Sequence, residues 1–282
     1  MPRTLERLRC SACECGPVKR GQRSRERIVD GNVANPHAYP WQISMYPNLT
    51  NYLTQLTNLA EQYNVVLPDF LKEELAKAAS KLQHGCGGSI ISAKYVMTAA
   101  HCLQLMMPPE IIEKLPPGSE LFFYNYPAEE VFIIVGEQNL QSYNNDKSTI
   151  TAEIERNSNI RRVSYIKIHD KWNPLENSYD FGLVKLASPL TFSASVAPVC
   201  LPDPSFSSTK YAGWTGTVSG WGATDPEGAN ISTVLKDLEV TVLSNEECLE
   251  KLRDATEDRA RAQGVNETMI NFLRSNASLL RY

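Results

Sequence analysis

Two cysteines, Cys86 and Cys102, enclose the segment that most restricts how this chain can fold. Between them lie two short apolar runs of strand character, at 88–92 and 95–99. A disulfide between the two cysteines would close a hairpin-sized loop and contribute roughly 3 kcal/mol through loop entropy. It would also fix the turn that carries His101. General-base catalysis needs an imidazole held in this way, because hydrogen-bond reach is only about 2.6–3.2 Å.

The chain from Ile28 onward consists of short apolar runs separated by Gly, Pro and Asn turns, which is typical of an all-β sandwich or barrel. The segments that we expect to form strands are 41–45, 88–92, 95–99, 131–135, 162–168, 182–186, 215–219 and 235–243. Residues 245–263 are typical of a charged helix. Residues 1–27 are polar, Arg-rich and without strand or helix periodicity, and we interpret them as a pro-segment.

Two insertions, 46–84 and 103–130, interrupt the strand pattern. The first has apolar stripes at helical spacing over about 50–83, with Pro68 and Asp69 as stop and restart. The stripes are Leu53, Leu56, Ala60 and Tyr63, then Leu71, Leu75, Ala78 and Leu82. Two amphipathic helices packed on a barrel explain them better than a device for binding a partner. The second insertion is rich in Pro and aromatic residues, so we expect a stiff loop without regular structure.

Seven cysteines bear on the compartment of the protein. Cys10 and Cys13 have the spacing of half a zinc site, but no second cysteine pair or suitable histidine pair follows them. Sparse, widely spaced cysteines fit a disulfide-bonded extracellular protein better. Their odd number then implies one thiol that is free or lacks its partner.

Secretion is also suggested by Asn-x-Ser/Thr sequons, which mark candidate N-glycan sites. The sequons start at Asn48, Asn230, Asn266 and Asn276. Residues 1–15 contain no apolar run of signal-peptide length, and no stretch approaches a transmembrane span. A net charge of −4 gives no argument for a nucleic-acid or anionic-membrane partner. We therefore expect a secreted protein whose signal peptide is not present in this sequence.

Several further motifs accompany the His101 segment, and their order along the chain identifies a family. They are Arg27 followed by Ile28-Val-Asp-Gly, then Pro40-Trp-Gln, Cys86-Gly-Gly-Ser, Thr98-Ala-Ala-His101-Cys102, Asp180-Phe-Gly-Leu-Val-Lys-Leu, Val199-Cys200-Leu-Pro and Ser219-Gly-Trp-Gly. Together they resemble the chymotrypsin/trypsin family of serine endopeptidases over about residues 15–270, apart from the two insertions. Several independent motifs in one order argue against a chance match.

The resemblance implies a trypsin-like double six-stranded β-barrel and a His-Asp-Ser triad. His101 would take the proton of the nucleophile and return it to the leaving amine, while Asp180 would hold the imidazole in the required tautomer. Cleavage after Arg27 would free the amine of Ile28, leaving 28–282 as the peptidase domain. A disulfide between Cys15 and Cys200 would tether the pro-segment after that cleavage.

The resemblance further implies protein or peptide substrates, or proteases of a cascade as partners, and no cofactor. The place of the calcium loop of trypsins falls between Glu137 and Glu153. Its carboxylates, on Glu137, Asp146 and Glu153, lack convincing ligand spacing, so we expect no metal.

The nucleophile of the family lies in Gly-Asp-Ser-Gly-Gly-Pro, and this segment is absent from the sequence. Ser89 and Ser219 belong to structural motifs, and Ser275 lies in Arg-Ser-Asn-Ala-Ser without a glycine, so none of them is a suitable replacement. Residues up to Ile270 resemble the family segment that continues into Cys-Ala-Gly, whereas 271–282 resemble nothing in the family. The missing cysteine is the usual partner of Cys248, and Cys10 and Cys13 are left over.

We therefore interpret the chain as an incomplete member of the family, with one complete barrel and a partial second one. Apolar faces at Val218, Leu238, Val240 and Val242 would meet water, at about 1.5–3 kcal/mol for each side chain not buried. A total stability of about 5–15 kcal/mol leaves little margin for such losses, so we expect poor folding or aggregation. As written, the chain is predicted to be an inactive form of a secreted, zymogen-activated endopeptidase. The alternatives are a non-catalytic homologue that binds or regulates partners in an extracellular cascade, and a degraded gene without function.

Overall fold

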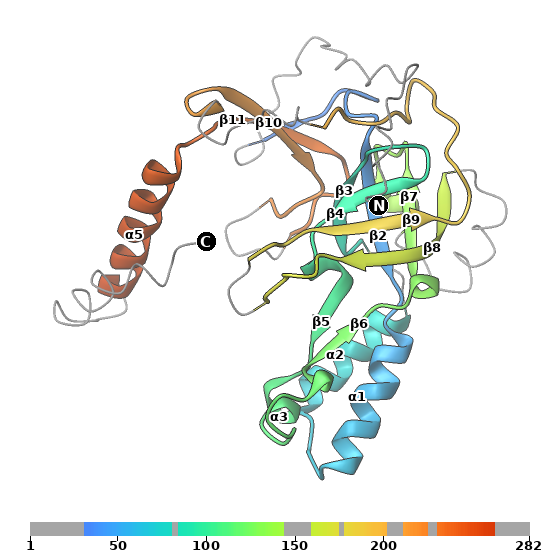
Figure 1. Cartoon of the computed structure of the whole chain (residues 1–282), viewed down its shortest axis with the longest axis vertical. Coiled ribbons are helices and arrows are strands. Elements are labelled where there is room, and N and C mark those ends of the chain that lie inside the picture. Colours follow the sequence, from blue (N-terminus) through green and yellow to red (C-terminus); the bar gives the residue numbers. More distant parts are fainter. Residues whose placement is uncertain are drawn as a thin grey trace, which may run out of the picture.

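A closed barrel of six strands forms the centre of the molecule in the computed structural model (Figure 1). The structure describes residues 31–80, 84–143, 159–174, 178–201, 211–224 and 230–262. The barrel strands, in their order around the barrel, are β2 (Gln42–Pro47), β3 (Cys86–Ile90), β4 (Tyr95–Thr98), β9 (Gly182–Leu186), β8 (Ile160–Ile168) and β7 (Val131–Val135). The predictions of an all-β fold and a complete first barrel are confirmed.

Strand β7 shows why these apolar runs form a barrel with a second layer beside it. All five of its residues are buried. Val131, Ile133 and Val135 point into the barrel core, whereas Phe132 and Ile134 belong to a second hydrophobic cluster with Trp221 and Leu235. Successive side chains of a strand point to opposite faces, so a continuous apolar run is required where both faces are covered.

A three-stranded sheet lies beside the barrel, in the order β1 (Asn32–Val33), β11 (Lys236–Thr241) and β10 (Thr215–Gly220). It is tied to the barrel region by two hydrogen bonds, in which the Tyr39 hydroxyl donates to Asp237 at 2.7 Å and the Ser219 hydroxyl donates to Gln42 Oε1 at 2.9 Å. Together with the Phe132 and Trp221 cluster, these bonds hold the end of the sheet at Ser219 and Asp237 against the barrel region, whereas Thr217 and Glu239 on the same face are exposed.

The opposite face of β10 and β11 carries apolar side chains in contact with solvent. Val218 and Leu238 are cross-strand partners, and they are 58% and 39% exposed. Val240, on the same face, and Val242 are partly buried. The exposure expected at Val218 and Leu238 is therefore present in the structure.

The first insertion forms two helices, α1 (Thr50–Gln62) and α2 (Asp69–Ser80), as the spacing of its apolar residues predicts. The buried residues of α1 are Tyr52, Leu56, Leu59 and Ala60. The Asn48 side chain, one position before the N-cap residue Leu49, accepts hydrogen bonds from the backbone N–H of Thr50 at 3.1 Å and from the Thr50 hydroxyl at 2.8 Å.

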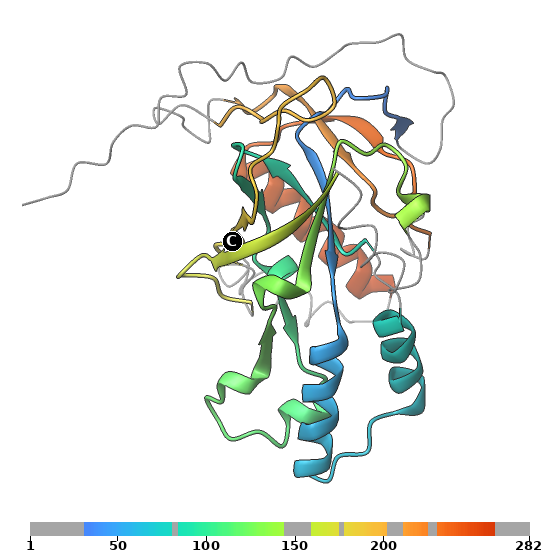
Figure 2. The same ribbon diagram turned by 90° about the vertical axis from the view of Figure 1, so that its right-hand side faces the viewer.

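The second insertion is more regular than its composition suggests, and the expectation of a loop without regular structure is wrong. Strands β5 (Gln104–Met106) and β6 (Phe123–Asn125) form an antiparallel hairpin, and α3 (Pro109–Ile112) lies between them. Pro109 stands in the first turn of α3, where a missing N–H costs nothing. Strands β5 and β6 contain no proline, so every residue of both strands keeps the backbone N–H that strand pairing requires. Figure 2 shows α1 between this hairpin and α2.

The remaining elements are short 3₁₀ helices and one long helix. The 3₁₀ helices are η1 (His101–Leu103), η2 (Glu120–Phe122), η3 (Ala128–Glu130) and η4 (Leu140–Tyr143). Helix α5 (Asn245–Ala262) begins where the charged-helix prediction placed it. Ser244 and Glu247 form reciprocal hydrogen bonds at its start, a capping box that fixes this boundary. None of the helices in the described part of the chain is both long enough and apolar enough to span a membrane.

The exposed β10–β11 face gives a prediction about self-association. Replacing both Val218 and Leu238 by lysine removes two adjacent apolar side chains from a solvent-exposed sheet face. At each concentration, we therefore expect the double variant to self-associate less than the unmodified chain. Sedimentation velocity over a concentration series measures the effect. The matched control is Thr215→Lys with Thr241→Lys, a cross-strand pair on the opposite face. Equal suppression by both double variants would show that added charge alone, and not this face, controls association.

Candidate active site

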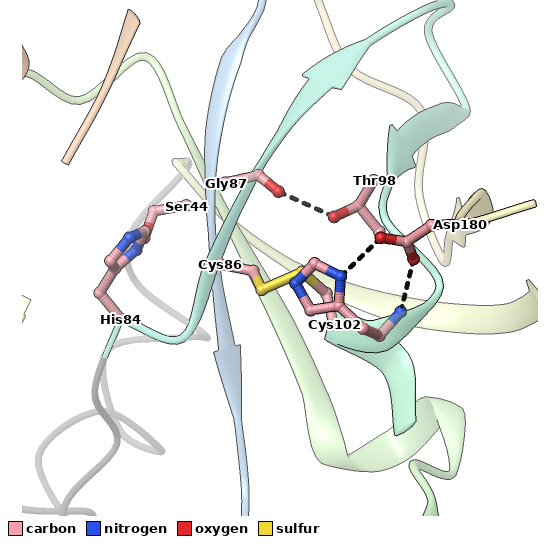
Figure 3. The surroundings of a disulfide bond; sticks show 8 residues. Ser44, His84, Cys86, Gly87, Thr98, Cys102 and Asp180 are labelled. Atoms are coloured by element: carbon pink, nitrogen blue, oxygen red, sulfur yellow. Dashed lines mark hydrogen bonds and ion pairs between the residues drawn. A yellow bond between two sulfur atoms is a disulfide. The ribbon is translucent and has the colours of Figure 1, made fainter. Parts of the chain in front are cut away.

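The turn that carries His101 is fixed from two directions. A disulfide joins Cys86, at the start of β3, to Cys102 directly after the histidine, with their Cα atoms 6.0 Å apart. The Thr98 hydroxyl donates to the carbonyl oxygen of Gly87 at 2.8 Å, which ties the end of β4 to β3 (Figure 3). Because Cys102 of the disulfide lies within η1 and the Thr98 bond lies three residues before His101, the two ties restrict the movement of the histidine backbone.

Asp180 meets His101 although 79 positions separate the two residues. Strands β4 and β9 are antiparallel neighbours with Thr98 opposite Gly182, so the residues just beyond these ends lie close together. The Asp180 Oδ2 atom lies 2.7 Å from His101 Nδ1, and the His101 backbone N–H donates to Oδ1 at 2.9 Å (Figure 3). Both carboxylate oxygens therefore fix the position of the same residue.

The ionisation of Asp180 decides which ring nitrogen of His101 can act as a base. Burial alone would raise the pKa of Asp180, but hydrogen bonds from the His101 backbone and ring, the charge of the ring and the Ala100 backbone N–H together lower this pKa below its ordinary value. An ionised carboxylate can only accept hydrogen bonds, so the ring proton stays on Nδ1. Nε2 is then the nitrogen that can accept a proton, and the His101 side chain is 60% exposed.

The backbone on the N-terminal side of Asp180 has an uncommon conformation. Tyr179 has a φ of 57°, and the Phe181 N–H donates to the Tyr179 carbonyl at 2.7 Å across a tight turn. A non-glycine residue with positive φ persists only where its surroundings hold it. Here the Tyr179 ring stacks on His169, with centroids 5.1 Å apart and an interplanar angle of 13°. His169 therefore supports the turn that presents Asp180.

Leu103 and Gly182 bring the two halves of the site into close contact. Leu103 is fully buried, and a Cβ atom on Gly182 would lie 2.4 Å from its Cδ1 atom and 3.2 Å from the Ala99 carbonyl oxygen. A side chain at 182 would therefore push η1 and β9 apart.

No serine of the described ranges occupies the place of a nucleophile. Ser219 donates its hydroxyl to Gln42, Ser89 lies within β3, and neither forms a hydrogen bond with the His101 ring. Ser275 lies outside the described residues. Within those residues, the recorded neighbours of the imidazole nitrogens are Asp180 Oδ2 and, 3.5 Å from Nε2, the Cys102 sulfur, which as part of a disulfide has no proton to donate.

A serine–histidine pair, Ser44 with His84, lies on the other side of the barrel strands β2 and β3 from the disulfide (Figure 3), and the sequence motifs do not indicate it. Ser44 Oγ lies 2.6 Å from His84 Nδ1, and the His84 ring packs edge-on against Tyr46 and Trp221. Burial lowers the pKa of His84 and favours its neutral form. Ser44 is 0% exposed, so a substrate cannot reach its hydroxyl. The partnership depends on β2 passing beside the segment before β3, which local sequence does not reveal.

The described residues offer no intact metal site at this position. One group, Cys86, His101 and Cys102, has the required proximity, but both sulfurs are consumed by the disulfide. Of the calcium-loop carboxylates, Glu137 accepts hydrogen bonds from the backbone N–H groups of Gln138 and Asn139. Asp146 and Glu153 lie outside the described residues.

Other predicted site residues are only partly covered by the structure. Arg27 and Ile28, the expected cleavage site, and Cys15 lie outside the described residues. Cys200 is disulfide-bonded, and Cys248 is a free, exposed cysteine.

Comparison with known proteins identifies the family to which the chain is similar. The family model described as Trypsin matches residues 75–277, a range that contains both His101 and Asp180. Serine proteinase stubble of Drosophila melanogaster is 25% identical to the chain over 244 residues. The match covers 86% of this chain but 23% of that relative, so the chain spans about a quarter of the relative's length.

The contact between Asp180 and His101 predicts a pH-dependent contribution to stability. Because the folded-state pKa of Asp180 is below its ordinary value of 3.8, the stabilisation is present above pH 3.8 and is lost as pH falls through the lower folded-state pKa. Asp180→Asn should cost about 1–3 kcal/mol at neutral pH and should show a shallower loss of stability in acid. Urea unfolding of both proteins across this range measures the difference. Parallel pH profiles would contradict the assignment.

The contact of Gly182 with Leu103 predicts a steric effect. Gly182→Ala should lower the free energy of unfolding by about 1–3 kcal/mol, because the added methyl group would overlap the buried Leu103 side chain. Chemical denaturation provides the measurement. The control is Gly220→Ala in β10, where an added Cβ meets nothing within 4 Å. A loss no larger than in this control would argue against close packing at 182.

Proposed function

The chain belongs to the trypsin family, and from this membership we propose that His101 and Asp180 are the general-base half of a serine endopeptidase triad. The observation that carries the proposal is the 2.7 Å contact of His101 Nδ1 with an ionised Asp180, which leaves an exposed ring nitrogen available. The chemistry is peptide-bond hydrolysis in protein substrates. In a complete triad, Nε2 would remove the proton of a serine hydroxyl as this oxygen attacks the carbonyl carbon.

Asp180 would contribute to this reaction without exchanging a proton. Its negative charge would stabilise the imidazolium that forms once Nε2 has accepted the serine proton. The imidazolium would then donate that proton to the leaving amine. The carboxylate accepts hydrogen bonds from both the ring and the backbone N–H of the same histidine, which favours this role because the two bonds set the ring orientation before substrate binds.

We further propose that the chain of this sequence does not hydrolyse peptide bonds by itself. The sequence contains no Gly-Asp-Ser-Gly-Gly segment, and no serine hydroxyl in the described ranges contacts the His101 ring. Removing any member of such a triad lowers catalysis by orders of magnitude, because the members act as a unit. The same observation supports the second candidate, a non-catalytic homologue that binds partners in an extracellular cascade.

Secretion and activation by cleavage complete the proposal. The disulfide between Cys86 and Cys102 favours an oxidising compartment. Arg27 before Ile28 supports activation by a protease that cleaves after arginine. The sequons at Asn48, Asn230 and Asn266 are candidate glycosylation sites, and a mass shift on enzymatic deglycosylation of the secreted protein would detect occupied ones.

A fluorophosphonate probe, which reacts with activated serine hydroxyls, tests the absence of a working nucleophile. We expect no labelling of the purified chain, either before or after cleavage behind Arg27, under conditions that label an active serine protease completely. The control is His101→Ala, which should behave like the unmodified chain. Labelling that disappears in His101→Ala would overturn the proposal, because it would reveal a serine activated by this histidine.

A longer transcript would separate the two candidate functions. Gly-Asp-Ser-Gly-Gly downstream of Ile270 supports the endopeptidase, whereas the same context with the serine replaced supports the non-catalytic homologue.

A further inference from the structure

The two insertions pack together as one accessory module, defined here as residues 50–80 and 103–130. The ring of Tyr52 in α1 contacts the ring of Tyr124 in β6 edge-on, with centroids 5.5 Å apart. The Tyr52 hydroxyl also donates to the carbonyl oxygen of Met106 at 3.4 Å. Buried side chains from both insertions share the barrel core cluster, among them Leu56, Leu59, Met107, Ile111 and Leu115.

Glu130 ties this module to the barrel. Its side chain is buried, with 3% of the residue exposed, at the point where β7 begins. One carboxylate oxygen accepts from the Asn51 amide and the other accepts from the Tyr124 hydroxyl at 2.6 Å. The Glu130 carbonyl accepts from the backbone N–H of Asn48 at 2.7 Å. A buried carboxylate with these partners holds α1 and β6 in a fixed relation to β7.

Gln104 is the residue at which the accessory module meets the candidate active site. It begins β5 directly after η1, which contains His101. Its side-chain nitrogen donates to Asn125 Oδ1 on β6 at 2.7 Å, and its side-chain oxygen accepts from Trp172 Nε1 at 3.0 Å. The amide therefore bridges the hairpin and the β8–β9 connection, which leads to Asp180.

Trp172 connects Gln104 to His169, which supports the turn that presents Asp180. Its backbone N–H donates to the His169 carbonyl at 2.9 Å. His169 in turn stacks on Tyr179, and its backbone N–H donates to the Phe181 carbonyl at 2.9 Å. The residues on both sides of Asp180 are thus held by His169. The tight turn with positive φ at Tyr179 needs external support of this kind.

We infer that Gln104 is a positioning residue through which the accessory module holds Asp180 against His101. The inference rests on the proposed function only in assigning a use to the His101–Asp180 pair. The module then presets the orientation of the imidazole, without contacting the reacting atoms itself. A change in the packing of α1 against the hairpin would alter the orientation of His101, because Asn125, Gln104 and Trp172 connect the hairpin to the Asp180 turn.

Three substitutions test this path in the whole chain. Gln104→Met keeps the size of the side chain but removes both hydrogen bonds, Trp172→Phe removes the donor, and Asn125→Ala removes the contact with β6. Carboxyl carbon NMR of aspartate-labelled protein, with Asp180→Asn to assign the signal, follows the ionisation of Asp180. We expect the pKa of Asp180 to rise toward 3.8 in all three variants. Amide exchange at Phe181 should accelerate roughly fivefold, the factor that corresponds to one lost hydrogen bond.

The control is Gln62→Met, the same chemical change at an exposed position of α1, and it should leave both readouts unchanged. Combining Gln104→Met with Trp172→Phe should give no more than the larger single effect, because both remove the same bond. An unchanged Asp180 in Gln104→Met and Trp172→Phe would overturn the inference. If Gln104→Met and Trp172→Phe change the pKa of Asp180 but Asn125→Ala does not, the link to the module is refuted. Neither readout measures hydrolysis, so the result is independent of probe labelling.

Discussion

The contact between Asp180 and His101 depends on closure of the six-stranded barrel. The two residues are 79 positions apart in the chain, and they meet because β4 and β9 pair with Thr98 opposite Gly182. This pairing also requires Leu103 to pack closely over Gly182. The carboxylate therefore reaches both the ring and the backbone of the histidine through barrel register, and the disulfide fixes the histidine side of the contact.

Strands β2 and β7 contribute side chains both to the barrel core and to the second hydrophobic cluster, which contains Trp221 and Leu235. Their successive side chains face the barrel core on one side and the second cluster on the other, so β2 and β7 pack between the barrel core and the region of the small β1-β11-β10 sheet. On its outer face, that sheet presents Val218 and Leu238 to water. The half of the molecule around His101 is thus well packed, whereas the β10–β11 part of the small sheet has exposed residues on both faces, among them Thr217 and Glu239 on one and Val218 and Leu238 on the other.

The accessory module shows where composition was a poor guide. The second insertion was expected to be irregular because of its prolines, yet Tyr124 is buried between Tyr52, Tyr126 and the carboxylate of Glu130. Tyr52 comes from α1 in the other insertion, whereas Tyr126 and Glu130 follow Tyr124 closely in the chain, so the hairpin is stabilised by contacts from both insertions. Tertiary contacts of this kind override local preference.

The amino-acid sequence alone predicts the strands, the two helices of the first insertion and the family, because apolar periodicity and the order of motifs are local properties. Strands β7 and β9 have the predicted bounds, and α5 begins at the predicted residue. It also identified His101 and Asp180 as candidates, through the residues on either side of them. The folded structure was needed to show that Asp180 accepts hydrogen bonds from both the ring and the backbone N–H of His101, that Ser44 and His84 pair out of reach of substrate, and that Gln104 joins the module to the Asp180 turn. These contacts link side chains that are separated in the chain, and the pairing of strands in the barrel and in the β5–β6 hairpin brings them within hydrogen-bond distance.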